Sequence, residues 1–404
     1  MTANLKNKLD NSFKNPLLKS PFYNFFSSEM RGGSWYDWAG YKSPTFIQDE
    51  ELEYFAIRST SSLFDVTPLI KYKISGPDAE NYLNKLTIRD VSKLQPNNVH
   101  YTAWCDDEGF VIDDGTLFRF NDETFRLCSQ ERHLPWLLDT AVGFDVNILE
   151  ETDDYAGISL QGPTSASILL KAGFKEISKL KPFELIVIKF KSYKVMISRT
   201  GFTGDLGYEI FISNDGASSL WEKIWSAGEL LGIKAIGFNA LNLARIETGF
   251  IVANSDFITS DHALRPDRAR RPDEIGLSWM VDLSKNHFNG KNAIIKARKN
   301  KENKYVLVSL EVEGKEPAEG SIIYHNKTNE VGIITSAAWS PTAKKSIALA
   351  SLKRPFGNIE KQNLWVEIYA LRELQYHKLM KKVSVVKRPF INLSRRTITP
   401  PLSR

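Results

Sequence analysis

SRTGFTGDLGYEI, residues 198–210, contains three glycines at every third position and decides how the rest of the chain is interpreted. This spacing is incompatible with a helix interior and costly in a strand. We therefore expect the backbone to turn here, or to be approached closely by another group. From Tyr208 the sequence alternates as a strand does, which places Glu209 on the opposite face from Tyr208 and Ile210. The stretch predicts a carboxylate beside a glycine-lined opening.

The composition is that of a folded protein with more than one domain. The chain has 404 residues, a length that exceeds the usual size of a single core. Of these residues 42% are apolar and 25% are charged, which is ordinary for a folded protein. Its two cysteines, Cys105 and Cys128, exclude a disulfide scaffold and favour a reducing compartment. No apolar run is long enough to cross a membrane, and Met1–Ser20 lacks a signal-peptide core. We predict a cytoplasmic protein with no membrane segment.

The net charge of +5 is concentrated at one end of the chain. Leu374–Arg404 contains eight Lys or Arg and no acid, so the remainder is slightly acidic. A solvated basic tail is the simplest interpretation, and docking to an acidic protein is an alternative. The segment lacks the interleaved aromatic residues and the basic face typical of nucleic-acid binding. No nucleic-acid partner is expected.

The pattern of elements divides the chain into successive regions. Residues 1–20 are predicted to be a flexible lead-in. Residues 21–280 alternate strand and helix patterns, which predicts an α/β region of two intertwined subdomains. After a connection at 281–303, residues 304–404 show short alternating strands, which predict an all-β barrel or sandwich with a basic tail. The predicted helices are Glu50–Ser62, Asp78–Leu86 with Asp78 as N-cap, Glu131–Val142, Thr164–Ala172, Gly216–Leu231 and Asn239–Gly249.

Candidate functional residues lie in a predicted hairpin and in a charged insert. The second strand of the hairpin, Phe110–Phe120, contains the consecutive aspartates Asp113 and Asp114. Because side chains alternate between faces, only one of these carboxylates can point into a given pocket. The insert Asp256–Pro272 carries four arginines, and either an ordered functional loop or disorder would explain it. No metal site is predicted.

Taken together, the motifs resemble the aminomethyltransferase (glycine-cleavage T-protein) family of tetrahydrofolate-dependent one-carbon enzymes. The similarity runs from about Pro21 to Phe390. Each motif is weak alone, but their number, order and spacing make the match strong. The motifs are Trp38-Ala39-Gly40, Leu63-Phe64-Asp65-Val66, Gly109 with Ile112-Asp113-Asp114, Gln161-Gly162-Pro163, SRTGFTG with Gly207-Tyr208-Glu209, Arg245-Ile246-Glu247, Glu274-Ile275-Gly276-Leu277, Phe288-Asn289-Gly290-Lys291, and Ser340-Pro341-Thr342 before Ser346-Ile347-Ala348-Leu349-Ala350.

The resemblance implies an α+β fold in which three domains form a ring around a central folate channel, with a barrel-like β domain last. It implies tetrahydrofolate as cofactor and a small methylated or aminomethylated substrate. For glycine cleavage it also implies a lipoyl carrier protein as partner. Region 21–280 would then bind the folate.

The resemblance also implies roles for individual residues. Glu209 matches the carboxylate that holds the amino and ring N–H edge of the pterin, since a carboxylate accepts two parallel hydrogen bonds. Asp114 matches the catalytic aspartate near the reactive folate nitrogens, where it can orient the substrate nitrogen, stabilise a cation or move a proton. Tyr101 matches a channel-lining position, Phe202 stands where a tyrosine is common, and Gln130 stands where an asparagine often contacts the pterin.

Several departures from the family pattern concern the channel. Thr67-Pro68-Leu69 replaces the usual Ser-His-Met, and Gly109-Phe110 replaces Gly-Gly. An arginine that usually helps to hold the folate is absent at Leu241, and Arg245, one turn further on, is a candidate substitute. These departures favour a demethylase-type member. A non-enzymatic relative that assists iron–sulfur assembly is the alternative, although that branch carries a Lys-Gly-Cys loop and this chain has none.

Overall fold

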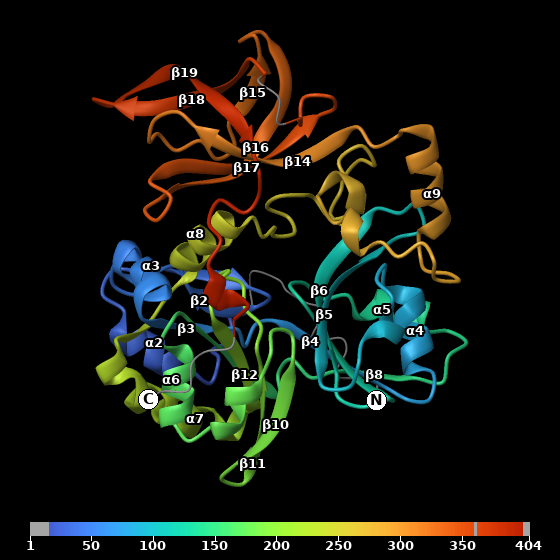
Figure 1. Ribbon diagram of the computed structural model, residues 1–404, viewed down its shortest axis with the longest axis vertical. Coiled ribbons are helices and arrows are strands. Elements are labelled where there is room, and N and C mark those ends of the chain that lie inside the picture. The colour runs from blue at the N-terminus through green and yellow to red at the C-terminus, as the bar shows by residue number, and fades with distance from the viewer. Residues whose placement is uncertain (1–15, 359–361, 399–404) are drawn as a thin grey trace.

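The protein folds into three lobes (Figure 1). The computed structural model describes residues 16–358 and 362–398, so most of the predicted lead-in, residues 1–20, lies outside the described residues. One lobe is built on a six-stranded sheet, the second on a five-stranded sheet, and the third is a closed six-stranded barrel. In Figure 1 the barrel lies above the two sheet lobes, which stand side by side. The predicted α+β class with a C-terminal barrel is confirmed.

The six-stranded sheet has the order β10-β11-β12-β9-β3-β13, and only the β13–β3 pair is parallel. Helices α2, α6 and α7 pack on one face, against apolar side chains such as Ile158 and Ile210. Helices α3 and α8 pack on the other face, together with the second sheet. The strands are β3 (Ser61–Asp65), β9 (Tyr155–Gln161), β10 (Leu185–Phe190), β11 (Tyr193–Ser198), β12 (Gly207–Ser213) and β13 (Ile233–Ala235). The helices are α2 (Tyr23–Glu29), α3 (Glu50–Ser59), α6 (Ser165–Lys171), α7 (Ala217–Gly228) and α8 (Phe238–Thr248).

The five-stranded sheet is antiparallel, with the order β5-β6-β7-β4-β8. Helices α4 and α5 cover its outer face, where Tyr72, Trp104 and Leu117 are fully buried. Its inner face is turned towards the first sheet. The elements are β4 (Ile70–Ser75), α4 (Ala79–Leu86), β5 (Asn98–Cys105), β6 (Val111–Arg119), β7 (Thr124–Ser129), α5 (Leu134–Thr140) and β8 (Asn147–Glu150).

The barrel closes in the order β14-β17-β16-β15-β18-β19. Its strands are β14 (Tyr305–Val312), β15 (Ile322–His325), β16 (Asn329–Ser340), β17 (Lys345–Lys353), β18 (Leu364–Arg372) and β19 (Gln375–Val386), and α9 (Lys291–Asn300) precedes it. A hairpin of β1 (Trp35–Trp38) and β2 (Tyr41–Pro44) lies near the start. Short 3-10 turns are η1 (Val91–Lys93), η2 (Lys175–Lys179), η3 (Asn214–Gly216), η4 (Glu229–Leu231), η5 (Pro272–Glu274), η6 (Ser278–Met280) and η7 (Ser394–Arg396). Within residues 16–358 and 362–398, no helix is long and apolar enough to cross a membrane.

The described part of the basic C-terminal segment, up to Ile398, is not a free tail, which corrects the simplest interpretation of its charge. Strand β19 closes the barrel, and the chain then returns to the first lobe (Figure 1). There Arg395 donates two hydrogen bonds to the Asp205 carboxylate, at 2.5 and 2.8 Å, and Arg58 pairs with the same carboxylate at 3.3 Å. Arg395 therefore stabilises a contact inside the fold. Asp205 belongs to the SRTGFTGDLGYEI stretch.

The helix predicted over Glu50–Ser62 and the N-cap predicted at Asp78 both differ from the structure because of tertiary contacts. The helix predicted over Glu50–Ser62 ends at Ser59, because Ser61–Asp65 forms the fully buried strand β3 instead. Asp78 precedes α4 but its side chain does not cap the helix; its Oδ2 accepts a hydrogen bond from the Asp145 backbone N–H at 2.9 Å. Tertiary contacts thus override the local preference at both positions.

Gly204 and Gly207 of the SRTGFTGDLGYEI stretch are buried and do not line an opening, which corrects that prediction for two of the three glycines, while Gly201 is exposed. A Cβ atom on Gly201 or Gly207 would lie 2.1 Å from the Gln161 amide oxygen. At Gly204, where φ is +66°, it would lie 1.9 Å from Thr248 Cγ2. The group that approaches this backbone so closely is the protein itself, through a side chain of β9 and one of α8. The stretch is a packing junction.

Gly204→Ala is expected to destabilise the fold more than a glycine-to-alanine change whose only cost is the positive φ of the backbone. Gly320 is the matched control, because its φ is +74° and nothing lies within 4 Å of an added Cβ. Gly320→Ala should cost about 1 kcal/mol, and Gly204→Ala a further 1–3 kcal/mol, roughly, for the steric clash. Urea unfolding measures both. Thr248→Ser removes Cγ2 and should recover much of the difference, whereas equal losses at the two glycines would contradict the packing junction.

Candidate active site between the two sheets

The candidate site lies where the inner faces of the two sheets meet. Phe118 of β6 and Phe211 of β12 contact edge to face, with ring centroids 6.4 Å apart. Alternation along β6 puts Asp114 on the same inner face as Phe118, and alternation along β12 puts Glu209 on the same face as Phe211. One carboxylate is therefore presented from each facing wall, beside a shared aromatic contact.

Asp114 is held by a phenol and has a strongly perturbed pKa. The Tyr101 hydroxyl on β5 donates a hydrogen bond to Asp114 Oδ2 at 2.7 Å. Burial and the charge of Asp113 raise the pKa of Asp114 to about 7, although the Tyr101 hydrogen bond lowers it. Burial and the nearby carboxylates raise the pKa of Tyr101 well above its usual value, so the phenol remains the donor. A carboxyl group with a pKa near neutrality can take up or release a proton at physiological pH.

Asp113 points away from this site, as the alternation of a strand predicts. Its side chain is fully buried on the outer side of β6, where His133 Nε2 lies 2.9 Å from Oδ2. Its other oxygen accepts a hydrogen bond from the Asp114 backbone N–H at 2.8 Å. Asp113 thus contacts the main chain that carries Asp114, but it does not reach the inner face.

Glu209 extends from β12 between its neighbours Ser198 and Ser159. The Thr200 hydroxyl donates a hydrogen bond to Oε2. Burial raises the pKa of Glu209, and the Thr200 contact lowers it. The charge of Glu209 also affects the Cys128 thiol on β7, so this carboxylate faces the five-stranded sheet. In the described chain, no side chain donates a hydrogen bond to the second oxygen of either carboxylate, Glu209 Oε1 or Asp114 Oδ1.

Phe202 and Gln130 lie near the two walls without a fixed polar contact. The Phe202 ring stacks on Phe250, with centroids 5.5 Å apart and an interplanar angle of 19°. Phe202 also packs against the cluster that contains Phe118 and Phe211. Gln130 follows β7 directly, is half-buried, and forms no hydrogen bond within the described residues. The roles given to both by resemblance stay predictions.

Arg245 is committed to the protein interior, which argues against its use as a replacement folate ligand. Its guanidinium pairs with Asp256 and also donates to Asn242, to the Phe250 carbonyl and to Ser336 of the barrel. The residue is only 2% exposed. Arg245 fastens α8 to the insert and the barrel, because buried charges are stable only when they are paired. Spacing along the sequence could not reveal these partners, which come from two distant segments.

Arg388 is a further candidate binding residue that the sequence analysis missed. It lies between two glycines: a Cβ on Gly249 would be 2.7 Å from its Cδ, and one on Gly276 would be 2.4 Å from Nη2. Burial lowers the pKa of Arg388, and the charge of Asp256 offsets part of this effect. Asp256 also affects the pKa of Asp114. Among the residues that the structure describes, none pairs with this guanidinium, so it is available to an anionic or carbonyl group.

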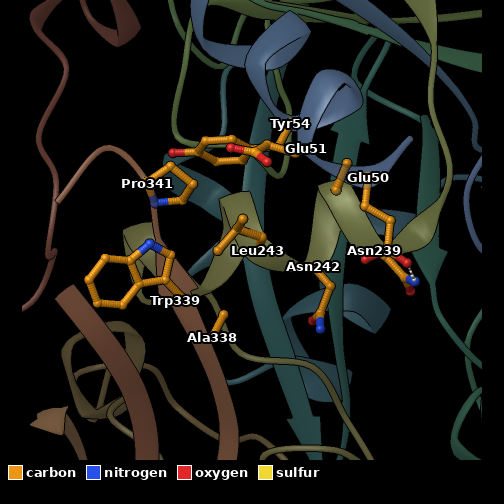
Figure 2. Close-up of a pocket in the computed structure, with 10 residues that line it drawn as sticks. Glu50, Glu51, Tyr54, Asn239, Asn242, Leu243, Ala338, Trp339 and Pro341 are labelled. Atoms are coloured by element: carbon orange, nitrogen blue, oxygen red, sulfur yellow. Dashed lines mark hydrogen bonds between the residues drawn. The ribbon is translucent and has the colours of Figure 1, made fainter. Parts of the chain in front are cut away.

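A separate cavity of about 490 Å³ lies at the junction of α3, α8 and the barrel (Figure 2). Figure 2 shows Trp339 and Pro341 on its barrel side, and Asn239 and Asn242 on its helical side. None of the predicted site residues lines it. Its amides are already engaged: Asn239 donates to Glu50 at 2.6 Å, and Asn242 accepts from Arg245 at 2.8 Å. The predicted carboxylates Asp114 and Glu209 thus lie between the sheets and away from this cavity.

Tyr101→Phe is expected to raise the pKa of Asp114 further. The variant keeps the aromatic packing and removes the hydrogen bond to the ionised carboxylate, a contact worth about 1.5–3 kcal/mol, or about one to two pKa units. Titration of Asp114 by carbon NMR on aspartate-labelled protein, with Asp114→Asn for assignment, measures this. Tyr208→Phe is the control, because the Tyr208 hydroxyl has no hydrogen-bond partner among the described residues. An unchanged titration in Tyr101→Phe would contradict the contact.

Comparison with known proteins gives the same assignment over nearly the whole chain. Residues 26–285 match the GCVT N-terminal domain, and residues 306–392 match the glycine cleavage T-protein C-terminal barrel domain. An aminomethyltransferase from Caldanaerobacter subterraneus subsp. tengcongensis is 32% identical over 359 residues, which cover 88% of this chain and 91% of that protein. An aminomethyltransferase from Clostridium botulinum is 31% identical over 341 residues, which cover 82% of this chain and 88% of that protein.

A solved structure shows the same fold. The crystal structure of glycine cleavage system aminomethyltransferase T from Bartonella henselae superposes with a TM-score of 0.81 at 22% identity, covering 93% of this chain and 98% of that one. Both domain matches, the relatives and the fold agree. The chain belongs to the glycine cleavage T-protein (GCVT) family.

Proposed function

We propose that this chain is a tetrahydrofolate-dependent one-carbon transferase, which moves a methyl or methylene unit from a small methylated or aminomethylated donor to tetrahydrofolate. The observation that carries the proposal is the pair of carboxylates, Asp114 and Glu209, on facing walls of the two sheets. The relatives described above are named as aminomethyltransferases, which supports an enzyme of this type.

The residues present fit a folate. No side chain within the described ranges donates to Asp114 Oδ1 or to Glu209 Oε1, and each carboxylate shares its strand face with an aromatic ring, Phe118 on β6 or Phe211 on β12. A flat ring with an N–H edge and an apolar face matches such a pair of surfaces. Glu209 is the residue that would hold the pterin edge, and Arg388 would face the more polar remainder. Arg245 has no part in this arrangement.

The chain's own groups divide the work. Bound tetrahydrofolate supplies the nitrogen nucleophile that accepts the one-carbon unit. Glu209 orients the ring system, since the hydrogen bonds that a partly buried carboxylate accepts from N–H groups are strong and directional. Asp114 holds or moves a proton at Oδ1, while the Tyr101 hydroxyl occupies Oδ2 and fixes the carboxyl plane. Because the pKa of Asp114 is about 7, both protonation states are populated during turnover at neutral pH.

The donor distinguishes two subclasses. A demethylase-type reaction on a small methylated donor is our first choice, because the chain departs from the family pattern at Leu69 and Leu241. Both residues pack on the cluster between the sheets. The second choice is glycine cleavage with a lipoyl carrier protein as partner. The relatives give no support to the iron–sulfur alternative, so it is not pursued. We place the enzyme in the cytoplasm, where its buried free thiols Cys105 and Cys128 would remain reduced.

Turnover of a donor panel with tetrahydrofolate tests this proposal. The panel holds methylated amines, methylated sulfonium compounds, methoxy-aromatics, and an aminomethylated lipoyl carrier, and 5-methyl and 5,10-methylene products are followed. Product from a free donor assigns a demethylase, and product only with the carrier assigns glycine cleavage. Failure of the wild-type protein to bind tetrahydrofolate would overturn the proposal.

A further inference from the structure

Behind the strand that carries Asp114 lies a second group of ionisable side chains. His133 Nε2 is 2.9 Å from Asp113 Oδ2, and His133 Nδ1 is 3.6 Å from Asp261 Oδ2. Asp113 and His133 are buried, with exposures of 0% and 5%. Asp261 belongs to the charged insert Asp256–Pro272. The three side chains therefore form a continuous line from the insert to the interior.

The row formed by Asp261, His133 and Asp113 ends at the main chain of Asp114. Asp113 Oδ1 accepts a hydrogen bond from the Asp114 N–H at 2.8 Å, and Asp113 Oδ2 also receives the Glu131 N–H at 3.4 Å. The Trp104 ring meets the His133 ring edge to face at 5.7 Å, so the imidazole is confined from the side. Asp113 is thus the single residue that joins His133 to the main chain of Asp114.

The insert is also joined to the same strand by its backbone. Strand β7 pairs with β6 only from Gly115 onward. Just before that point, the Ser260 N–H donates to the Val111 carbonyl and the Val111 N–H donates to the Arg270 carbonyl, both at 2.9 Å. The insert therefore continues the pairing of β6 towards its start. The sequence left order and disorder of this segment open, and the structure describes it as an ordered extension of the sheet.

We propose that Asp261, His133 and Asp113 form a relay behind β6 that positions Asp114 and makes its ionisation depend on the 256–272 insert. The three act as positioning residues, because none of them reaches the inner face. The inference rests on the proposed function only for the use of Asp114; the relay itself is a property of the free protein.

The effect of the relay on the ionisation of Asp114 follows from the signs of the charges. The Asp113 carboxylate disfavours a second negative charge on Asp114 and raises the pKa of Asp114, as does the more distant Asp256. His133 lies between the Asp113 and Asp261 carboxylates, so a positive charge on its ring would offset the effect of Asp113. Around the insert end, His262 Nδ1 lies 3.3 Å from Asp261 and His262 Nε2 lies 3.9 Å from Glu131. On the inner side, Tyr101 faces Asp114 directly.

Titration of Asp114 in the ligand-free protein tests the relay, using carbon NMR on aspartate-labelled enzyme. His133→Gln keeps a hydrogen-bond donor towards Asp113 but cannot carry a charge, so the pKa of Asp114 should rise by about half to one unit. In the relay Asp261 favours a positive charge on His133, so Asp261→Asn should raise the pKa of Asp114 by a smaller amount, because the direct loss of a negative charge acts in the opposite direction. Asp113→Asn should lower it, because that variant removes the repelling charge.

Asp267→Asn is the matched control. It removes the same charge from the same insert, but Asp267 is exposed and pairs only loosely with Arg265 at 3.6 Å. The titration of Asp114 should not change in this variant. If both His133→Gln and Asp261→Asn also leave it unchanged, the relay is wrong. If His133→Gln does not fold, Asp261→Asn decides alone, since the Asp261 side chain is 40% exposed and tolerates substitution.

The pH profile of turnover gives an independent readout. With an active donor, the apparent pKa of the profile should move in the same direction as the Asp114 titration in each variant. A uniform loss of activity without such a shift would indicate a structural role and contradict the relay. Because the titration needs no folate, a protein that shows the shifts but never turns over would overturn the proposed function and leave the relay standing.

Discussion

Replacing Asp114 by asparagine is expected to reduce turnover about 100- to 10 000-fold, the usual contribution of a positioned acid or base. The side chain keeps its shape but can no longer hold or release a proton at Oδ1. Folate affinity should change little, because Glu209 on the opposite wall holds the pterin edge. Steady-state turnover and folate titration calorimetry of the variant measure the two effects separately.

The same variant should be more stable than the wild type above pH 7, which separates a catalytic carboxylate from a structural one. The folded-state pKa of Asp114 is about 7, above the usual value of 3.8. As the pH rises from 4 to 7 the unfolded chain therefore releases this proton before the folded chain does, and the wild type loses stability over that window. Asparagine removes this cost, so at pH 8 the variant should gain more than about 1 kcal/mol, whereas near pH 4 it should match the wild type.

Asp122→Asn is the matched control for Asp114→Asn. Asp122 lies in the turn after β6, and its side chain is 87% exposed. Its replacement should leave both turnover and the pH dependence of stability unchanged. A loss of stability in Asp114→Asn at every pH, with turnover retained, would show that Asp114 is structural.

Glu209→Gln is expected to weaken tetrahydrofolate binding about 10- to 100-fold, the cost of losing a hydrogen bond to a charged group. The amide keeps one acceptor but turns an NH₂ group towards a ligand edge that itself donates. Titration calorimetry measures the affinity, and Glu222→Gln on the exposed face of α7 provides the control. Since burial raises the pKa of Glu209, the fold should tolerate the neutral amide. Unchanged affinity would exclude Glu209 as the pterin anchor.

The features of the site that depend on one strand could be predicted from the sequence. A period of two is enough to place Asp113 and Asp114 on opposite faces of β6, and to separate Glu209 from Tyr208 on β12. What local periodicity cannot give is which face of a strand meets another sheet. The facing of Asp114 and Glu209 depends on packing between lobes.

The features that sequence reasoning missed all depend on distant partners. The three glycines are fixed by Gln161 and Thr248, which lie on β9 and α8. The Arg245 guanidinium pairs with Asp256 and donates a hydrogen bond to Ser336 of the barrel. Arg388 lies in a segment that was interpreted as a tail. The alternating pattern of β19 directly before it could have indicated that this segment belongs to the fold. In each case the deciding contact joins elements that no short window contains.

A crystal structure of the complex with tetrahydrofolate tests the central claim most directly. The account predicts that the pterin lies between the two sheets, with its amino and ring N–H groups bonded to Glu209 and the reactive nitrogens next to Asp114. It also predicts that the cavity lined by Trp339 and Pro341 stays free of folate (Figure 2). Folate bound in that cavity, or between the sheets with its pterin edge away from Glu209, would contradict the account.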